Sequence, residues 1–116
     1  MIISTFKIAP LAKQRLKVLE ILQSIQGHIS AQPGCLSCEI YTDVGLGRSI
    51  LFSEHWANEA ALYEHIRSGI YLRVLSAAEL SSTAPEIRFY RVSETQDMEL
   101  IRQLRLTSGT GIPAVP

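Results

Sequence analysis

Hydrophobic residues alternate with other residues through segment 1–8, MIISTFKI. A period of two residues is typical of a strand with one buried face. From Leu11 to Ile29 the hydrophobic positions recur at steps of three, four or seven, and this spacing predicts a long amphipathic helix. Pro33 and Gly34 follow the helix, and both residue types favour a turn.

Two more strand-like runs lie in the middle of the chain, at 35–44 and 48–57. Gly45 and Gly47 separate them, and glycine permits the positive φ angles of a tight hairpin. The pattern therefore predicts two antiparallel strands joined by a short turn.

A second helical pattern occupies 59–68, directly after Asn58, a residue type favoured at the N-cap. Gly69 interrupts this pattern, which resumes over 70–80. The run 86–92, EIRFYRV, is rich in strand-forming residues and predicts a fourth strand.

The predicted order is β-α-β-β-α-β, the ferredoxin-like arrangement of the α+β class. It implies one four-stranded antiparallel sheet with helices on one face. We expect residues 1–93 to form this domain and residues 94–116 to form a C-terminal extension. The extension has the spacing of a short helix or arm, followed by a flexible tail.

Strand alternation sorts the side chains of the predicted sheet into two faces. The bulkier set is expected beneath the helices: Ile2, Ser4, Phe6, Ile8, Leu36, Cys38, Ile40, Ile50, Phe52, Glu54, Trp56, Ile87 and Phe89. The opposite face is half apolar: Ile3, Thr5, Lys7, Cys35, Ser37, Glu39, Tyr41, Leu51, Ser53, His55, Arg88, Tyr90 and Val92. Large exposed apolar patches usually mark interfaces. We therefore predict a homodimer packed sheet on sheet, with a monomer whose tail covers this face as the alternative.

The charges and the apolar runs of the chain exclude two classes of partner. The chain has 116 residues, with 11 Lys plus Arg against 11 Asp plus Glu, so it lacks the basic excess of a nucleic-acid-binding protein. No apolar run approaches the roughly 20 residues that cross a bilayer, and no signal-like core follows the N-terminus. We expect a cytoplasmic protein that binds neither nucleic acid nor membrane.

Cys35 and Cys38 form a CxxC motif, a spacing used by zinc sites and thiol redox centres. Redox motifs of this type open a helix, whereas this one lies in a predicted strand, where side chains three apart point to opposite faces. No second cysteine pair completes a tetrahedral zinc site. We predict two ordinary thiols and no metal.

The segment 51–66, LFSEHWANEAALYEHI, carries the candidate chemistry. Glu54 and Trp56 are expected under the helices, whereas His55 points to the other face. Glu54 either accepts backbone N–H groups at a helix start or orients a catalytic group. Trp56 is either core or a flat wall for an aromatic ligand. His65 lies near the buried stripe of the second helix, either as a structural residue or as the best available general base.

The ordered series of these motifs resembles the antibiotic biosynthesis monooxygenase (ABM) family over residues 1–93. The matching features are a Pro-Gly turn, a Glu-x-Trp strand end, a small-residue helix with a central His and a Ser-x-hydrophobic-aromatic continuation. In this chain they are Pro33, Gly34, Glu54, Trp56, His65, Ser68, Ile70 and Tyr71. The resemblance implies a ferredoxin-like fold dimerised through its sheets.

Members of the family include oxygenases that need no cofactor, in which a deprotonated phenolic substrate itself reduces dioxygen. For this chain the resemblance implies His65 as base, Glu54 as its orienter, and a pocket lined by Trp56, Phe6, Phe52, Leu62 and Tyr71. The partners would be a small aromatic substrate and dioxygen.

Departures from the family pattern narrow the choice of activity for this chain. The pattern of haem-degrading members has an Asn on the first strand and a ligand His after the second helix. This chain has Ser4 and Phe6 on the first strand and Leu75 near the second position, so haem is not expected. Phe52 stands where anthrone-type members favour a polar amide. One alternative is an isomerase or other metabolic enzyme on a small polar substrate, with Arg67, Arg73 or Arg91 pointing inward. A noncatalytic dimeric binding module with a sealed interior is the other.

Overall fold

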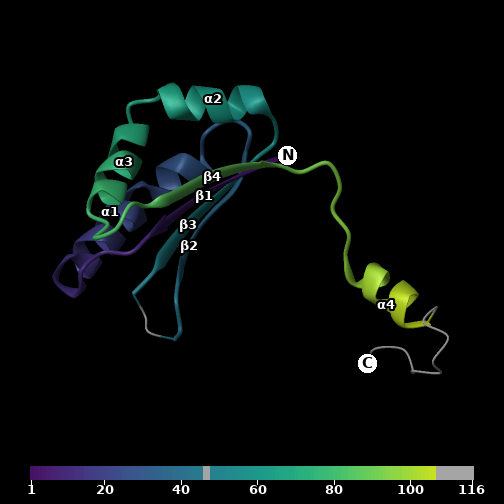
Figure 1. Cartoon of the computed structure of the whole chain (residues 1–116). Helices are drawn as coiled ribbons and strands as arrows, with labels where there is room; N and C mark the ends of the chain where they lie inside the picture. The colour runs from purple at the N-terminus through teal and green to yellow at the C-terminus, as the bar shows by residue number, and fades with distance from the viewer. Residues whose placement is uncertain (46–47, 107–116) are drawn as a thin grey trace.

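The sheet has four antiparallel strands in the order β2-β3-β1-β4 (Figure 1). The structure is a computed structural model that describes residues 1–45 and 48–106. The strands are β1 (Ile2–Ile8), β2 (Cys35–Thr42), β3 (Ile50–Trp56) and β4 (Glu86–Arg91). Each strand coincides with a run of alternating or β-branched residues. The predicted ferredoxin-like α+β fold is confirmed.

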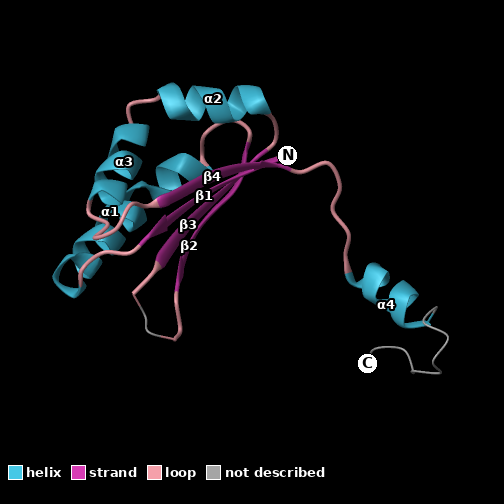
Figure 2. Ribbon diagram, viewed as in Figure 1, coloured by secondary structure: helices cyan, strands magenta, loops and turns pink. Residues whose placement is uncertain are grey.

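Three helices lie on one side of the sheet, as Figure 2 shows. They are α1 (Ala12–Ser30), α2 (Glu59–Arg67) and α3 (Tyr71–Glu79), and they pack on β2, β3 and β1 respectively. The predicted interruption at Gly69 separates α2 from α3. A fourth helix, α4 (Met98–Leu106), forms in the predicted extension.

The core fills the space between these helices and the two central strands. Phe6, Phe52 and Trp56 are completely buried there, together with the apolar stripe of α1. The apolar stripe of the helix forms one side of the core, and the inward-facing residues of the strands form the other, as the sequence predicts.

The predicted faces of β2 are wrong at its first two positions. The pairing register shifts between Cys35 and Ser37, so Leu36 is an extra residue in a β-bulge and is 58% exposed. Cys35 pairs with Trp56 and Cys38 pairs with Glu54. Both cysteines therefore lie on the helix side, because the bulge cancels the alternation that would have separated them.

The expectation that Ile87 and Phe89 lie under the helices is also wrong. Both are on the helix side of the sheet, because they pair with Phe6 and Ser4. They are nevertheless 41% and 46% exposed, since β4 is an edge strand beyond the helices that cover β2, β3 and β1.

The Pro-Gly turn before β2 has a close contact with α2. Gly34 has a φ of +82°, and a Cβ built on it would lie 2.4 Å from the Ala61 Cβ. Among the glycines that the structure describes, only Gly34 has a positive φ, so the prediction for Gly45 is wrong and Gly47 lies outside the described residues. The backbone of Gly34 also accepts a hydrogen bond from Ala57 N, which fixes this turn against the end of β3.

Helix α4 lies apart from the sheet and the other helices (Figure 1). None of its residues is buried, although Leu100, Ile101 and Leu104 are all apolar. The predicted tail beyond it falls outside the described residues. None of the described helices is long and apolar enough to cross a membrane.

Candidate functional site

Glu54 and Trp56 reach the site from β3. They are two residues apart, so both point to the helix side, and both are completely buried. His55, between them, points to the open face and is half-buried. The sheet separates His55 from its two neighbours, as alternation predicts.

His65 reaches the same place from α2. Asn58 is the N-cap of this helix, and its side chain accepts a hydrogen bond from Ala61 N at 2.9 Å. His65 follows Leu62 by three residues, so both face the core, and His65 is 1% exposed. Ser68 ends the helix and donates its hydroxyl to the His65 carbonyl at 2.6 Å.

Glu54 joins the other two side chains. Trp56 Nε1 donates to Glu54 Oε1 at 3.1 Å, and His65 Nε2 lies 3.0 Å from Glu54 Oε2. The rings of Trp56 and His65 stack with centroids 4.6 Å apart. A buried carboxylate is costly without such partners, so this arrangement both satisfies Glu54 and fixes the ring of His65.

The pairing leaves a specific atom of His65 unused. A carboxylate accepts hydrogen bonds and cannot donate one, so Nε2 carries the hydrogen of the contact with Glu54. Nδ1 of the neutral ring then presents a lone pair, and it is buried without a partner. The arrangement suits a proton acceptor at Nδ1.

Tyr71 completes the aromatic surroundings of His65. It lies edge-on to the His65 ring, with centroids 5.1 Å apart, and edge-on to Phe6 at 6.1 Å. Burial, and then the negative charge of Glu54, raises the pKa of Tyr71 to about 12. Tyr71 therefore stays neutral and acts as a wall.

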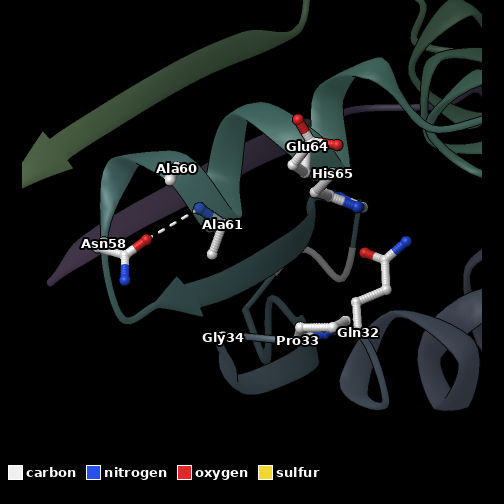
Figure 3. Close-up of a pocket in the computed structure, with 8 residues that line it drawn as sticks. All are labelled: Gln32, Pro33, Gly34, Asn58, Ala60, Ala61, Glu64 and His65. Carbon is white, nitrogen blue, oxygen red and sulfur yellow. Dashed lines mark hydrogen bonds between the residues drawn. The ribbon is translucent and has the colours of Figure 1, made fainter.

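A pocket of about 500 Å³ opens beside His65 (Figure 3). It lies between α2 and the turn that precedes β2. Its lining residues are Gln32, Pro33, Gly34, Asn58, Ala60, Ala61, Glu64 and His65. His65 therefore connects this pocket to the buried carboxylate of Glu54.

The other residues that were predicted to line a pocket do not line this one. Phe6 and Phe52 are completely buried in the core, and Leu62 is 3% exposed. Neither these three nor Trp56 and Tyr71 line the pocket in Figure 3. Their contact with a substrate stays a prediction.

Sequence reasoning missed several residues of the pocket, above all Gln32. The sequence predicts the Pro-Gly turn as a helix stop and as a feature of the family, but not as part of a pocket wall. The small residues Ala60 and Ala61 were the available signal, since small side chains allow a turn and a helix to approach closely.

The two cysteines do not add an activated thiol to the site. Both are free, and Cys35 donates to the carbonyl of Ser37 at 3.5 Å. Burial, and then the charge of Glu54, raises the pKa of both thiols. Over the described part of the chain, no group of three or more His, Cys, Asp or Glu residues is arranged to hold a metal ion.

Comparison with known families bears on this arrangement directly. The family model for antibiotic biosynthesis monooxygenase matches residues 1–77, more than half of the chain. The chain belongs to the ABM family. The resemblance seen in the sequence is thereby confirmed. Among curated proteins, none matches the chain.

Solved structures share the ABM fold with this chain. Rv0793 from Mycobacterium tuberculosis has 20% sequence identity and a TM-score of 0.75, and the match covers 83% of this chain and 98% of Rv0793. A Deinococcus radiodurans protein placed among the antibiotic biosynthesis monooxygenases has 23% identity and a TM-score of 0.74, with 84% and 97% covered. SnoaB, a cofactor-independent oxygenase from Streptomyces nogalater, has 12% identity and a TM-score of 0.69, with 81% and 94% covered.

Proposed function

We propose that this ABM protein is a cofactor-independent monooxygenase that oxidises a quinol, or another electron-rich aromatic or polyketide-like molecule, with dioxygen. Membership of the family supports a monooxygenase at the family level, and SnoaB has the same fold. The observation that carries the proposal is the unpaired Nδ1 of His65 at the wall of a pocket, with Glu54 behind it.

His65 is the proposed base. Its Nδ1 takes the proton of a substrate hydroxyl, and the imidazolium that results lies against Glu54, 3.0 Å from Nε2. The carboxylate stabilises this positive charge and holds the ring in the required orientation. Glu54 therefore acts through His65, as a positioning residue.

The electrons come from the substrate. Loss of the proton makes the ring a phenolate, which is a better reductant of dioxygen. In the complete reaction a quinol and dioxygen give a hydroxyquinone and water. One oxygen atom forms a new bond to a ring carbon, the other leaves as water, and the quinol supplies all the electrons.

Apolar surroundings favour such a reaction by excluding water from the base. Trp56 stacks on His65, and Tyr71 lies edge-on to it. Phe6, Phe52 and Leu62 are buried in the same core. We propose that these five residues form the apolar surroundings of the base.

Oxygen consumption tests the proposal. Purified protein is incubated in air with a panel of monocyclic and fused-ring quinols, and the dissolved oxygen is followed with an electrode. We expect faster uptake than in buffer, and its loss in His65→Ala. The control is His28→Ala, because His28 is an exposed residue of α1. Buffer-level uptake with every quinol would refute the function, whereas full activity of His65→Ala would refute only the role of His65.

The two alternatives find less support. An isomerase or other metabolic enzyme of a small polar substrate would need basic residues in the pocket, but Arg67 contacts Glu64, Arg73 donates to Ser24 and Arg91 contacts Glu59. None of these three arginines lines the pocket. A noncatalytic module with a sealed interior is disfavoured by the opening beside His65.

We also propose that the protein is a homodimer through its open sheet face. Tyr41 and Tyr90 are about half exposed on this face, at 54% and 48%. Ile3 and Leu51 lie between them on the central strands and are half-buried. A second copy would cover this aromatic and aliphatic surface.

The charges of the open face favour one arrangement of the two copies. Glu39 and Arg88 lie in the same row across the sheet, since Glu39 pairs with Ser53, Ser53 with Thr5 and Thr5 with Arg88. They are on opposite edge strands, about 14 Å apart, too far to pair within one chain. A two-fold axis parallel to the strands would place Glu39 of each copy opposite Arg88 of the other.

A further inference from the structure

Gln32 is a polar residue of the pocket lining whose backbone is held by two hydrogen bonds. Its backbone N–H donates to Ile29 O at 3.0 Å, and its carbonyl accepts from Cys35 N at 3.0 Å. These bonds fix the turn from both sides. The side chain extends from the turn toward His65 (Figure 3).

Two of the residues that line this pocket each carry a buried acceptor atom without a partner. These atoms are Oε1 of Gln32 and Nδ1 of His65. Buried polar atoms are nearly always hydrogen-bonded, and an unpaired one is costly. Two such atoms on residues that line one pocket point to a ligand that donates two hydrogen bonds.

The remaining lining residues define the rest of that ligand. Pro33, Gly34, Ala60 and Ala61 are small or apolar and leave space for a flat ring. None of the lining residues is Lys or Arg, and Glu64 adds a negative charge. An anionic ligand would therefore be repelled, whereas an uncharged ligand with hydroxyl donors would be accepted.

We propose that the pocket recognises an uncharged aromatic diol at two points, with one hydroxyl donating to His65 Nδ1 and the other to Gln32 Oε1. Gln32 is thus the residue that distinguishes a diol from a phenol with a single hydroxyl. This assignment rests on the proposed function, because it places the substrate of the oxidation in the same pocket. The hydroxyl at His65 is the one that loses its proton, and the hydroxyl at Gln32 fixes the orientation of the ring.

Binding without oxygen tests this recognition separately from turnover. Calorimetric titrations in an anaerobic chamber compare hydroquinone with its monomethyl and dimethyl ethers, and the naphthalene hydroquinone with its ethers. Each methylation removes one donor. We expect each to weaken binding to the wild type by roughly two- to tenfold, the range of a single hydrogen bond.

Variants at Gln32 isolate its contribution. Gln32→Leu removes the acceptor, so the diol and the monomethyl ether should bind with equal affinity. Gln32→Glu keeps an acceptor and should keep the preference for the diol. Gln23→Leu, a change at an exposed glutamine of α1, should behave as the wild type. Thermal unfolding establishes that each variant is folded.

Several outcomes would overturn the assignment. One is equal binding of a diol and its ethers to the wild type, which would mean that the two acceptors are satisfied by water. Another is a preference for the diol that survives in Gln32→Leu or disappears in Gln32→Glu. Failure of every diol to bind would also overturn it. Tight, selective binding of a diol with no oxygen uptake in air would instead refute the monooxygenase and leave this recognition intact.

Discussion

Glu54 Oε2 lies 3.0 Å from His65 Nε2, and the two residues join β3 to α2 inside the core. The contact fixes which nitrogen of His65 carries the hydrogen. Because the contact links β3 to α2, it contributes to the stability of the core. Because it places the hydrogen on Nε2, it leaves Nδ1 available as a base.

Glu54→Gln should disturb both properties. A carboxamide can donate to His65 Nε2, which moves the ring hydrogen to Nδ1 and removes the lone pair needed for proton transfer. We expect kcat for oxygen uptake to fall by roughly 10²–10⁴ and the free energy of unfolding to fall by about 1–3 kcal/mol. Steady-state kinetics and urea unfolding measure the two effects. Glu20→Gln, at an exposed position of α1, should change stability by less than about 0.5 kcal/mol.

Gly34→Ala should destabilise the turn that forms one wall of the pocket. The positive φ of Gly34 costs a residue with a Cβ roughly 1–2 kcal/mol. The new Cβ would also meet the Ala61 Cβ, at 2.4 Å. Adding Ala61→Gly should relieve the clash and leave the backbone cost. A double-mutant cycle of unfolding free energies should therefore show favourable coupling, and strict additivity would contradict the predicted clash.

The matched glycine control, Gly27, lies in the last turn of α1. A Cβ on Gly27 would meet nothing within 4 Å, and its φ is not positive. Gly27→Ala should stabilise the protein by about 0.5–1 kcal/mol through helix propensity. The opposite signs of these two glycine substitutions separate a local clash from a general effect of glycine.

The sequence predicted the fold and the Glu54, Trp56 and His65 cluster because both follow from periodicity. Alternation puts Glu54 and Trp56 on one side of β3, and the helix period turns His65 toward them. Periodicity also explains the errors at β2. One bulged residue, Leu36, reverses the face of Cys35 before it, and no local signal in the sequence marks the bulge.

The pocket was less predictable, because it depends on contacts between distant segments. Gln32 belongs to a turn, which has no period, and its place beside His65 follows from the approach of Gly34 to Ala61. The exposure of Phe89 has a similar origin. Its side of the sheet was predicted correctly, but the extent of the helical layer over β4 depends on how the helices pack.

Tyr71 should make stability decline at alkaline pH. Its pKa is about 12 in the folded protein against an ordinary value of 10.0, so the unfolded chain loses this proton first. The contribution is fully present below pH 10 and is lost as the pH rises toward 12. Tyr71→Phe should therefore show a shallower decline of the unfolding free energy over this interval. The buried thiols titrate in both proteins and cancel in the comparison. Parallel curves would contradict the assignment.

Truncation after Ser93 tests whether residues 1–93 form the folding unit. Helix α4 has no buried residue, and the last backbone bond that joins β4 to β1 is from Val92 N to Met1 O. Removal of the extension should leave the circular dichroism of the domain intact and shift its Tm by only a few degrees. Truncation after Pro85 removes β4 and should prevent folding. Unfolding of the longer fragment would assign the extension a structural role.

The open sheet face should determine the oligomeric state. Leu51→Glu places a charge on the central strand β3 within this face and should convert a dimer to a monomer in sedimentation velocity experiments. Leu72→Glu, at a position of α3 that is 66% exposed, should leave the dimer unchanged. Arg88→Glu alone should weaken the dimer by opposing Glu39 of the other copy. Adding Glu39→Arg should restore it, because the reversed pair has the same complementarity. A monomeric wild type would refute the dimer, and a double variant weaker than Arg88→Glu would refute the two-fold axis parallel to the strands.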